Sequence, residues 1–168
     1  MLDKPLFLKN GAGKIMGLEY TFIVSPKMEN GRRILFGGKV LELMDEASGT
    51  LANYYYSKKP KQVVVHTGEE VHFLKPLRAG ETGKVIARVL LVTKKIICIY
   101  MEVRGGQPGK NTKLTRRYAG FGLCAAINKE GKMIKNLKPY RSRAGLTGQA
   151  ERIVKFQRMI RKEILNAQ

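Results

Sequence analysis

The sequence predicts an α+β fold in which one long helix lies on one face of an antiparallel sheet. Residues 38–55 have the 3.6-residue apolar period of an amphipathic helix. A short alternating segment precedes this helix, and three longer apolar segments rich in β-branched residues and one further strand follow it. One long helix combined with antiparallel strands is typical of a two-layer α+β domain, with the helix covering one face of the sheet.

Each predicted element ends at a recognisable signal. The first strand, residues 18–24, ends at Ser25-Pro26, because proline cannot donate to a strand ladder. The helix ends before Lys58-Lys59-Pro60. Turn and glycine-rich segments separate the remaining strands, which we expect at residues 62–73, 83–92, 95–103 and 114–128. A single sheet of this kind leaves an edge open, so we expect two subunits to pair edge to edge.

The long helix carries an aspartate at the margin of its apolar face. On a helical wheel Asp45 lies at the edge of a stripe roughly 140° wide, whose members are Val40, Leu41, Met44, Ala47, Ser48, Leu51 and Ala52. A carboxylate near a buried surface is costly unless it is paired or used in chemistry. At this border it could meet a substrate and keep its access to water. The structural alternative is an Asp45 that is paired with a nearby lysine.

Two glycines stand where this helix begins. Gly37 and Gly38 have no Cβ, and the backbone N–H groups at a helix N-terminus have no partner within the helix. Such donors suit an oxyanion or a carbonyl oxygen that gains negative charge. The alternative is a tight turn from a loop into the helix.

The segment from Asn30 to Phe73 resembles the hotdog-fold acyl-CoA thioesterases of the acyl-CoA hydrolase type. Their pattern is an Asn, a short loop, Phe-Gly-Gly and a helix with Met-Asp-Glu-Ala, and here Asn30 lies six residues before Phe36 and Asp45 nine after it. Weaker similarity at residues 73–81 and 125–132 extends the resemblance to about residues 18–140. Three positions depart from the family, which usually has Gly at Arg33, Thr at Val65 and Thr-Ser at Lys95-Ile96.

The resemblance implies a hotdog fold and the hydrolysis of an acyl-CoA to a free acid and CoA. It implies that Asp45 acts as a general base or as a nucleophile, that Asn30 of one subunit faces Asp45 of its partner, and that Gly37 and Gly38 stabilise the oxyanion. It also implies a homodimer or a larger assembly of dimers, and no cofactor, because CoA is part of the substrate. A non-catalytic acyl-CoA-binding sensor or regulator of the same fold is the alternative.

The chain is strongly basic, with a formal net charge of +19. Such a field attracts polyanions, and CoA is one. The candidates to bind its phosphates are Lys94, Lys95, Arg104, Arg116 and Arg117, and solvated basic strand faces are the alternative. The chain has no Trp, no interleaved aromatic and basic residues and no helix-turn-helix pattern, so we expect no specific nucleic-acid partner.

Cysteine, histidine and hydropathy patterns limit other classes of function. Cys98 and Cys124 lie in apolar strands without a CxxC spacing and are interpreted as reduced core thiols. The only two histidines, His66 and His72, are interpreted as surface or interface residues, so no metal site is expected. No apolar run approaches the ~18 residues of a membrane span and the N-terminus lacks a signal-peptide core, so we expect a cytoplasmic protein.

The C-terminal segment is distinct from the family core. We expect a hotdog domain over residues 1–144 and a basic amphipathic helix over residues 145–168, with Thr147 as its cap. The apolar face of this helix is predicted to contain Ile153, Phe156, Ile160 and Ile164. It would pack on the sheet or on a neighbouring subunit, and the alternative is an anionic membrane surface or an acidic partner.

Overall fold

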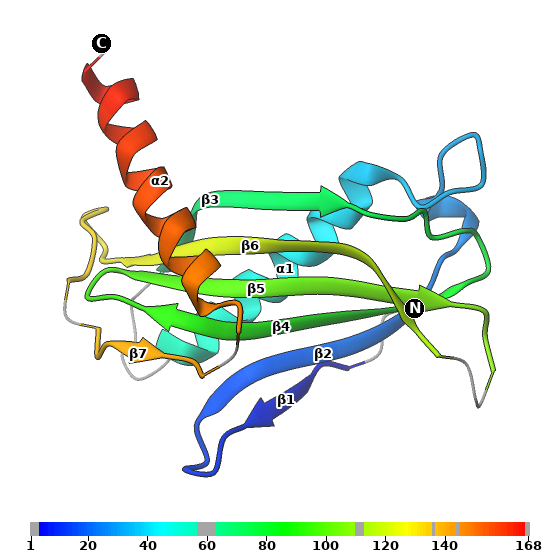
Figure 1. Cartoon of the computed structure of the whole chain (residues 1–168), viewed down its shortest axis with the longest axis horizontal. Helices are drawn as coiled ribbons and strands as arrows, with labels where there is room; N and C mark the ends of the chain where they lie inside the picture. The colour runs from blue at the N-terminus through cyan, green and yellow to red at the C-terminus, as the bar shows by residue number, and fades with distance from the viewer. Residues whose placement is uncertain (1–3, 57–62, 110–112, 136, 144, 167–168) are drawn as a thin grey trace.

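The computed structural model describes the backbone of residues 4–56, 63–109, 113–135, 137–143 and 145–166, and side chains up to residue 160. The chain forms an antiparallel sheet with one helix on each face (Figure 1). The elements follow in the order β1 (Leu6–Lys9), β2 (Ile15–Ile23), the 3-10 helix η1 (Pro26–Met28), α1 (Gly37–Tyr56), β3 (Val63–Phe73), β4 (Thr82–Val92), β5 (Ile96–Gly106), β6 (Thr115–Ile127), β7 (Tyr140–Arg141) and α2 (Thr147–Asn166).

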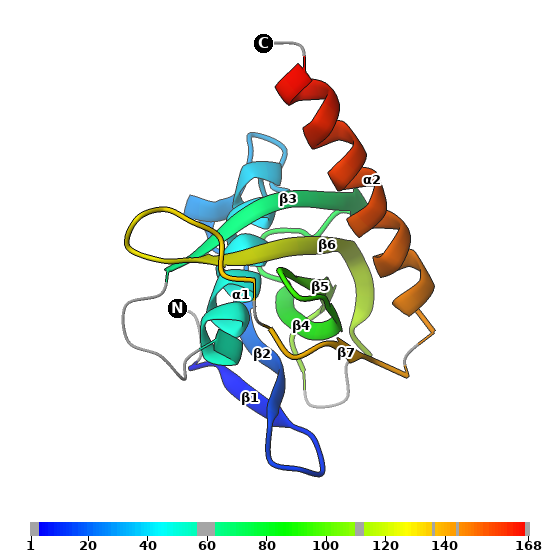
Figure 2. The same ribbon diagram turned by 90° about the vertical axis from the view of Figure 1, so that its left-hand side faces the viewer.

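The sheet order is β1-β2-β4-β5-β6-β3, and β7 pairs with β4. The chain therefore leaves β2, crosses the back of the sheet as α1 and returns as β3 at the opposite edge (Figures 1 and 2). On one side β3 pairs with β6, and no other strand of the described chain pairs with its outer side. This topology leaves an eleven-residue edge open, as expected for a sheet that pairs with a second subunit.

The helix α1 packs into the curve of the sheet (Figure 2). The predicted buried stripe is correct except for Leu41, which is 39% exposed, while Leu43 is 1% exposed. The sheet wraps around the flank of α1 that carries Leu43, where the hydroxyl of Tyr20 on β2 donates to the carbonyl of Leu43 at 2.7 Å. The curvature of the sheet, which a helical wheel does not contain, thus rotates the buried stripe.

The helix α2 covers part of the opposite face of the sheet (Figures 1 and 2). Ala150 and Val154 are buried against residues of β4, β5 and β6, and Ile153 packs beside them. Of the residues predicted for its apolar face, Ile153 packs on the sheet, whereas Phe156 is 53% exposed in the single chain because the contact with the sheet is centred on Val154. The helix begins at Thr147, whose hydroxyl donates to the carbonyl of Ser142 at 2.9 Å. The side chain of Ile164 lies outside the described part.

Strand boundaries differ from the prediction where glycine has a packing role. The segment 105–109 is predicted as a loop, yet β5 continues through Gly105 to Gly106. A Cβ at Gly105 would lie 2.1 Å from Cδ1 of Leu77, so glycine is needed there for close packing within the sheet layer. The short strands β1 and β7 were not predicted. Cys98 and Cys124 are buried free thiols, as expected.

Candidate active site

Asp45 lies on the exposed margin of α1, as the helical period predicts. Its side chain is 54% exposed, and its Oδ1 atom lies 2.8 Å from Nδ1 of His66 on β3. The partner of the carboxylate is therefore a histidine from the edge strand, and not the lysine considered from the sequence. This contact ties the middle of α1 to the strand that ends the sheet.

The other ring nitrogen of His66 contacts a buried serine. Its Nε2 lies 2.6 Å from Oγ of Ser48, and Ser48 is completely buried. Ser48 follows Asp45 by three residues, which places both side chains on neighbouring positions of one helix face. Asp45, His66 and Ser48 form a continuous chain of contacts, referred to below as the Asp-His-Ser set. The contact of His66 with Asp45 and Ser48 was not predicted from the sequence. A signal was present, because His66 follows Val64 by two residues and Val64 packs against the core beneath α1.

A bulge in β3 determines which side chains join His66. The pairing with β6 shifts between His66 and Gly68, so Thr67 is an extra residue in the strand. After the bulge, Val71 again packs in the core beneath α1, whereas Gly68 lies under Gln157 of α2. The alternation of side chains after the bulge therefore places Glu69 on the α1 face, which is also the face of His66.

The bulge also separates the two histidines. Nε2 of His72 lies 2.7 Å from Oε1 of Glu70, and both residues line a hollow on the α2 face. Within the described residues, no group of three His, Cys, Asp or Glu side chains is arranged to hold a metal ion.

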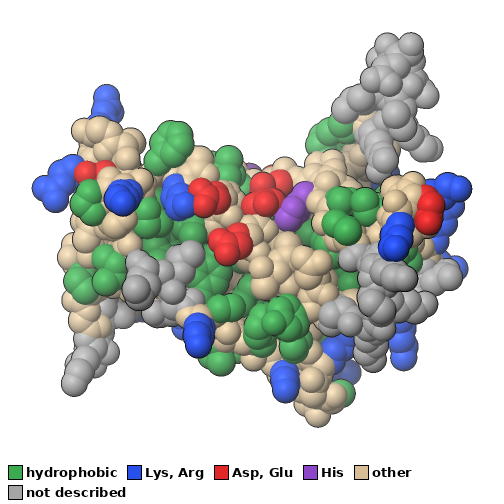
Figure 3. Space-filling model, turned by 180° about the vertical axis from the view of Figure 1, so that it is seen from behind, with side chains coloured by type: hydrophobic (Ala, Val, Ile, Leu, Met, Phe, Trp, Pro, Cys, Tyr) green, Lys and Arg blue, Asp and Glu red, His purple; other side chains and the backbone are tan. Residues whose placement is uncertain are grey.

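The surroundings of Asp45 are acidic although the chain is basic. Asp45 shares the α1 side with the exposed Glu42, Glu46 and Glu69, and Figure 3 shows acidic side chains gathered beside a histidine in the middle of this face. Atoms packed around the carboxyl group of Glu69 raise its pKa, and the charge of Asp45 raises it further. Glu42 is paired with Lys39, so Glu46 and Glu69 carry the unpaired negative charge on this side of the described chain.

The glycine pair marks the beginning of α1, as predicted. The carbonyl of Phe36 accepts from the N–H groups of Lys39 and Val40, whereas within the described residues the N–H groups of Gly37 and Gly38 reach no backbone acceptor. A Cβ at Gly38 would lie 2.6 Å from the ring of Phe36. The close turn considered as the alternative is thus present, and it leaves two free donors beside the exposed rings of Phe36 and Phe73.

Asn30 shapes the loop before α1. Its Oδ1 accepts from the N–H groups of Arg32 at 2.9 Å and Ile34 at 3.3 Å, which fixes a tight turn. Arg33, where the similar family usually has glycine, has a φ of +57°, in the left-handed region that glycine adopts most easily. No contact joins Asn30 to Asp45 within the described chain, and the Nδ2 donors of Asn30 remain available.

The five basic residues proposed for CoA do not form one group in a subunit. Lys94 and Lys95 lie in the turn between β4 and β5, whereas Arg104, Arg116 and Arg117 lie near the far ends of β5 and β6. Nine residues of strand separate Lys95 from Arg104, which is roughly 30 Å. Arg117 is engaged with the carbonyls of Pro76 and Gly105 and with Glu81.

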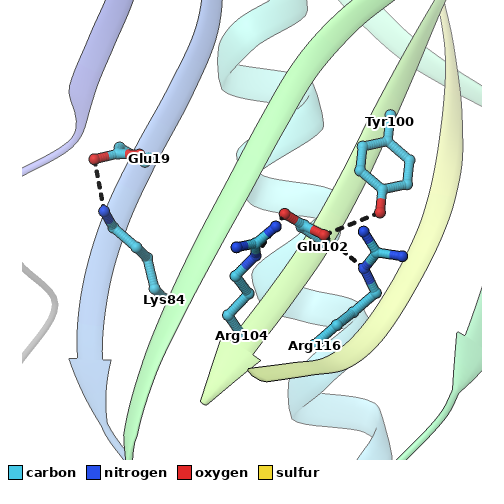
Figure 4. A network of polar contacts seen from close by, with 6 residues as sticks. All are labelled: Glu19, Lys84, Tyr100, Glu102, Arg104 and Arg116. Carbon is cyan, nitrogen blue, oxygen red and sulfur yellow. Dashed lines mark hydrogen bonds and ion pairs between the residues drawn. The ribbon is translucent and has the colours of Figure 1, made fainter. Parts of the chain in front are cut away.

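Arg104 and Arg116 surround a buried carboxylate on the α2 face (Figure 4). Glu102 is 4% exposed and lies 2.8 Å from Nε of Arg104 and 2.7 Å from Nε of Arg116, and it accepts from the hydroxyl of Tyr100 at 3.0 Å. Burial favours a higher pKa for Glu102, but the hydrogen bonds from Arg116, Arg104 and Tyr100 outweigh it and lower the pKa. Beside this network is the hollow of about 460 Å³ between α2 and the sheet, and the sheet separates it from Asp45.

Comparisons with known proteins agree with this architecture. Residues 33–111, just under half of the chain, match the family model of the thioesterase superfamily. A comparison with curated proteins finds no match. No helix in the described residues is long and apolar enough to cross a membrane.

Solved structures of acyl-CoA hydrolases have the same fold. The Staphylococcus aureus acyl-CoA hydrolase in complex with butyryl coenzyme A, coenzyme A and coenzyme A disulfide has a TM-score of 0.77 and 20% identity, covering 90% of this chain and 93% of that one. The acyl-CoA hydrolase from Bacillus cereus has a TM-score of 0.73 and 21% identity over 90% and 91%. A hexameric thioesterase from Yersinia pestis has a TM-score of 0.61 and 21% identity over 70% and 93%. The predicted hotdog fold is confirmed.

Proposed function

We propose that this protein is an acyl-CoA thioesterase, because residues 33–111 match the family model of the thioesterase superfamily and the chain has the fold of solved acyl-CoA hydrolases. In the proposed reaction water adds to the thioester carbonyl carbon, the C–S bond breaks, and a free acid and the thiol of CoA leave. The observation that carries the proposal is the half-exposed carboxylate of Asp45, which lies on the α1 face of the matched segment and is held there by His66.

Two routes are consistent with an exposed Asp45 carboxylate. As a general base, Asp45 takes a proton from the attacking water and passes it to the departing thiolate. As a nucleophile, it attacks the carbonyl carbon directly, the thiolate departs, and water then hydrolyses the mixed anhydride. Both routes need an electrophilic carbonyl, which the free N–H groups of Gly37 and Gly38 would polarise in the proposed site.

We place Asn30 in the site from a second subunit. Within one chain its Oδ1 holds the turn, so its Nδ2 donors are left to bind the thioester carbonyl or the attacking water. Pairing of two β3 edges would continue the sheet across a dimer and would cover the exposed Phe36 and Phe73. A hexameric relative with this fold supports an assembly of dimers.

The rings of Phe36 and Phe73 beside the start of α1 support an apolar path for the acyl chain along this helix. For the phosphates of CoA, the separation of the basic residues means that one molecule engages either Lys94 and Lys95 or the group around Arg104 and Arg116. The arginine group lies on the face away from Asp45, so it would serve a neighbouring subunit's substrate.

The test is a panel of acyl-CoA substrates of increasing chain length, with release of the CoA thiol as the readout. We expect turnover of at least one substrate and its loss in Asp45→Ala, with the neighbouring Glu46→Gln as a matched control that keeps activity. Tight binding of acyl-CoA without turnover by the wild type would contradict the enzyme and would support the sensor.

A further inference from the structure

We propose that His66 positions Asp45. The imidazole of His66 holds one carboxylate oxygen of Asp45, so that the other oxygen faces the substrate. The inference rests on the proposed thioesterase function and adds two members, His66 and Ser48, to its site. The family motif of Asn, Phe-Gly-Gly and Met-Asp-Glu-Ala contains neither role.

The number of protons on the ring and its neighbours determines which tautomer His66 adopts. A carboxylate is only an acceptor, so the 2.8 Å contact with Oδ1 of Asp45 requires a proton on Nδ1 of His66. A neutral imidazole has a single ring proton, so Nε2 is then an acceptor. Ser48 supplies the matching donor: its Oγ lies 2.6 Å from Nε2, closer than the 3.1 Å to the carbonyl oxygen of Asp45, which is the other acceptor within reach of the single hydroxyl proton. The buried hydroxyl thus selects the tautomer that the carboxylate needs.

The burial of each member shows which end reacts. The order of contacts is that of a Ser-His-Asp triad, but here the serine is completely buried while the aspartate side chain is 54% exposed. A Cβ at Gly122 of β6 would lie 3.1 Å from Oγ of Ser48, which leaves no room for a substrate at the hydroxyl. Ser48 therefore anchors the set, and Asp45 is its reacting end.

The groups around Asp45 and His66 explain why the imidazole is needed to hold the Asp45 carboxylate. On β3, partial burial raises the pKa of Glu69, and the charge of Asp45 raises it further. The two carboxylates are therefore close enough to repel each other. On β6, Cys124 is opposite His66, and burial raises the pKa of its thiol to about 12, so it carries no charge at neutral pH. On α1, Gly49 lies against the ring and adds no side chain. The imidazole is thus the group that holds the Asp45 carboxylate against the repulsion of Glu69.

The kinetic test compares two substitutions of His66 with a control on the same strand. His66→Val removes the donor, and we expect kcat to fall by about 10- to 10²-fold through misplacement of the carboxylate, with KM changed less than about 3-fold. His66→Asn keeps an N–H donor near the Nδ1 position and should recover most of kcat. Thr67→Val, at the bulge, removes a hydroxyl that donates to Leu123 on the far side of the strand and should leave kcat unchanged.

A second measurement does not depend on activity. Nitrogen-15 NMR of the two histidines reports which ring nitrogen carries the proton. We expect Nδ1–H at His66 and Nε2–H at His72, because the contact of His72 with Glu70 is made by Nε2. In Ser48→Ala the tautomer preference of His66 should weaken, while His72 stays unchanged as an internal control.

The outcomes separate this inference from the proposed function. A wild type that hydrolyses no acyl-CoA would overturn the function. An active wild type with undiminished kcat in His66→Val, or with Nε2–H as the resting form of His66, would overturn the role of His66 and leave the function standing.

Discussion

The Oδ1 atom of Asp45 lies 2.8 Å from Nδ1 of His66, and this contact joins the central helix to the edge strand of the sheet. The two residues are 21 positions apart, and they meet because the chain crosses the back of the sheet between β2 and β3. The edge strand therefore has two tasks in the proposed enzyme. Its inner face holds the reacting carboxylate, and its open edge is the place where a second subunit would add Asn30.

The first prediction concerns the reacting oxygen. Asp45→Asn keeps the shape of the side chain but removes the base or nucleophile, so we expect kcat to fall by on the order of 10² or more. Thermal unfolding should change little, because the side chain is exposed. Glu42→Gln, one turn earlier on α1, is the control with the same loss of charge, and the exposed ion pair with Lys39 that it removes contributes little to stability. An undiminished kcat in Asp45→Asn would remove Asp45 from the mechanism.

The second prediction concerns the shared site. If each site takes Asn30 from one subunit and Asp45 from the other, a 1:1 mixture of Asn30→Ala and Asp45→Ala should regain roughly a quarter of wild-type activity after subunit exchange. Half of the dimers are then mixed, and each contains one intact site. As a control, subunits with both substitutions should form inactive mixed dimers with the wild type. Exchange confirmed by mass spectrometry without recovered activity would mean that one subunit builds its site alone.

The placement of Asp45 could be predicted from the sequence because it depends on local periodicity. A helix with a period of 3.6 fixes which residues flank the buried stripe, and Asp45 remains at that margin even though Leu43 replaces Leu41 in the core. The missing Cβ atoms at the start of the helix indicated the glycine pair, and the family motif added Asn30 by its spacing. These features need no knowledge of which strands are neighbours.

The partner of Asp45 could not be predicted in the same way. His66 reaches Asp45 only because β3 crosses to the far edge of the sheet, and the extra residue Thr67 then decides that Glu69 follows His66 onto the same face. Crossover and bulge are set by long-range pairing with β6, which leaves no periodic signal within β3. Gly105 shows the same limit, since its glycine indicates a loop until the packing of Leu77 is known.

The third prediction concerns the buried carboxylate on the α2 face. The pKa of Glu102 is lowered in the folded protein, so its ionised form stabilises the fold above the pKa of the unfolded chain, and this stabilisation is lost as pH falls. Glu102→Gln should lower the free energy of unfolding at pH 7 by about 1–3 kcal/mol, because hydrogen bonds to a charged acceptor are lost. The two arginines are partly exposed, so water limits the cost.

Denaturant unfolding at pH 7 and pH 3.5 checks this sign. The gap between wild type and Glu102→Gln should be largest at pH 7 and should shrink in acid. The exposed Glu130→Gln serves as the control and should follow the wild type at both values. A gap that widens as pH falls would contradict the lowered pKa of Glu102.

The last prediction concerns the net charge of +19, which serves either CoA or a larger polyanion. Counterion release makes binding to a duplex fall steeply with salt, and six or more phosphate contacts lose about 10³ in affinity between 50 and 200 mM salt. A CoA site engages only a few phosphates, so KM for an acyl-CoA should rise only several-fold over the same interval. Lys94→Gln with Lys95→Gln should raise KM if the turn between β4 and β5 binds these phosphates, and Arg104→Gln with Arg116→Gln should do so if the group around Glu102 does.

We expect DNA binding to be weak, independent of sequence and absent at physiological salt. Nanomolar binding of a defined nucleic acid at that salt, in competition with acyl-CoA, would contradict the enzyme and favour a regulator.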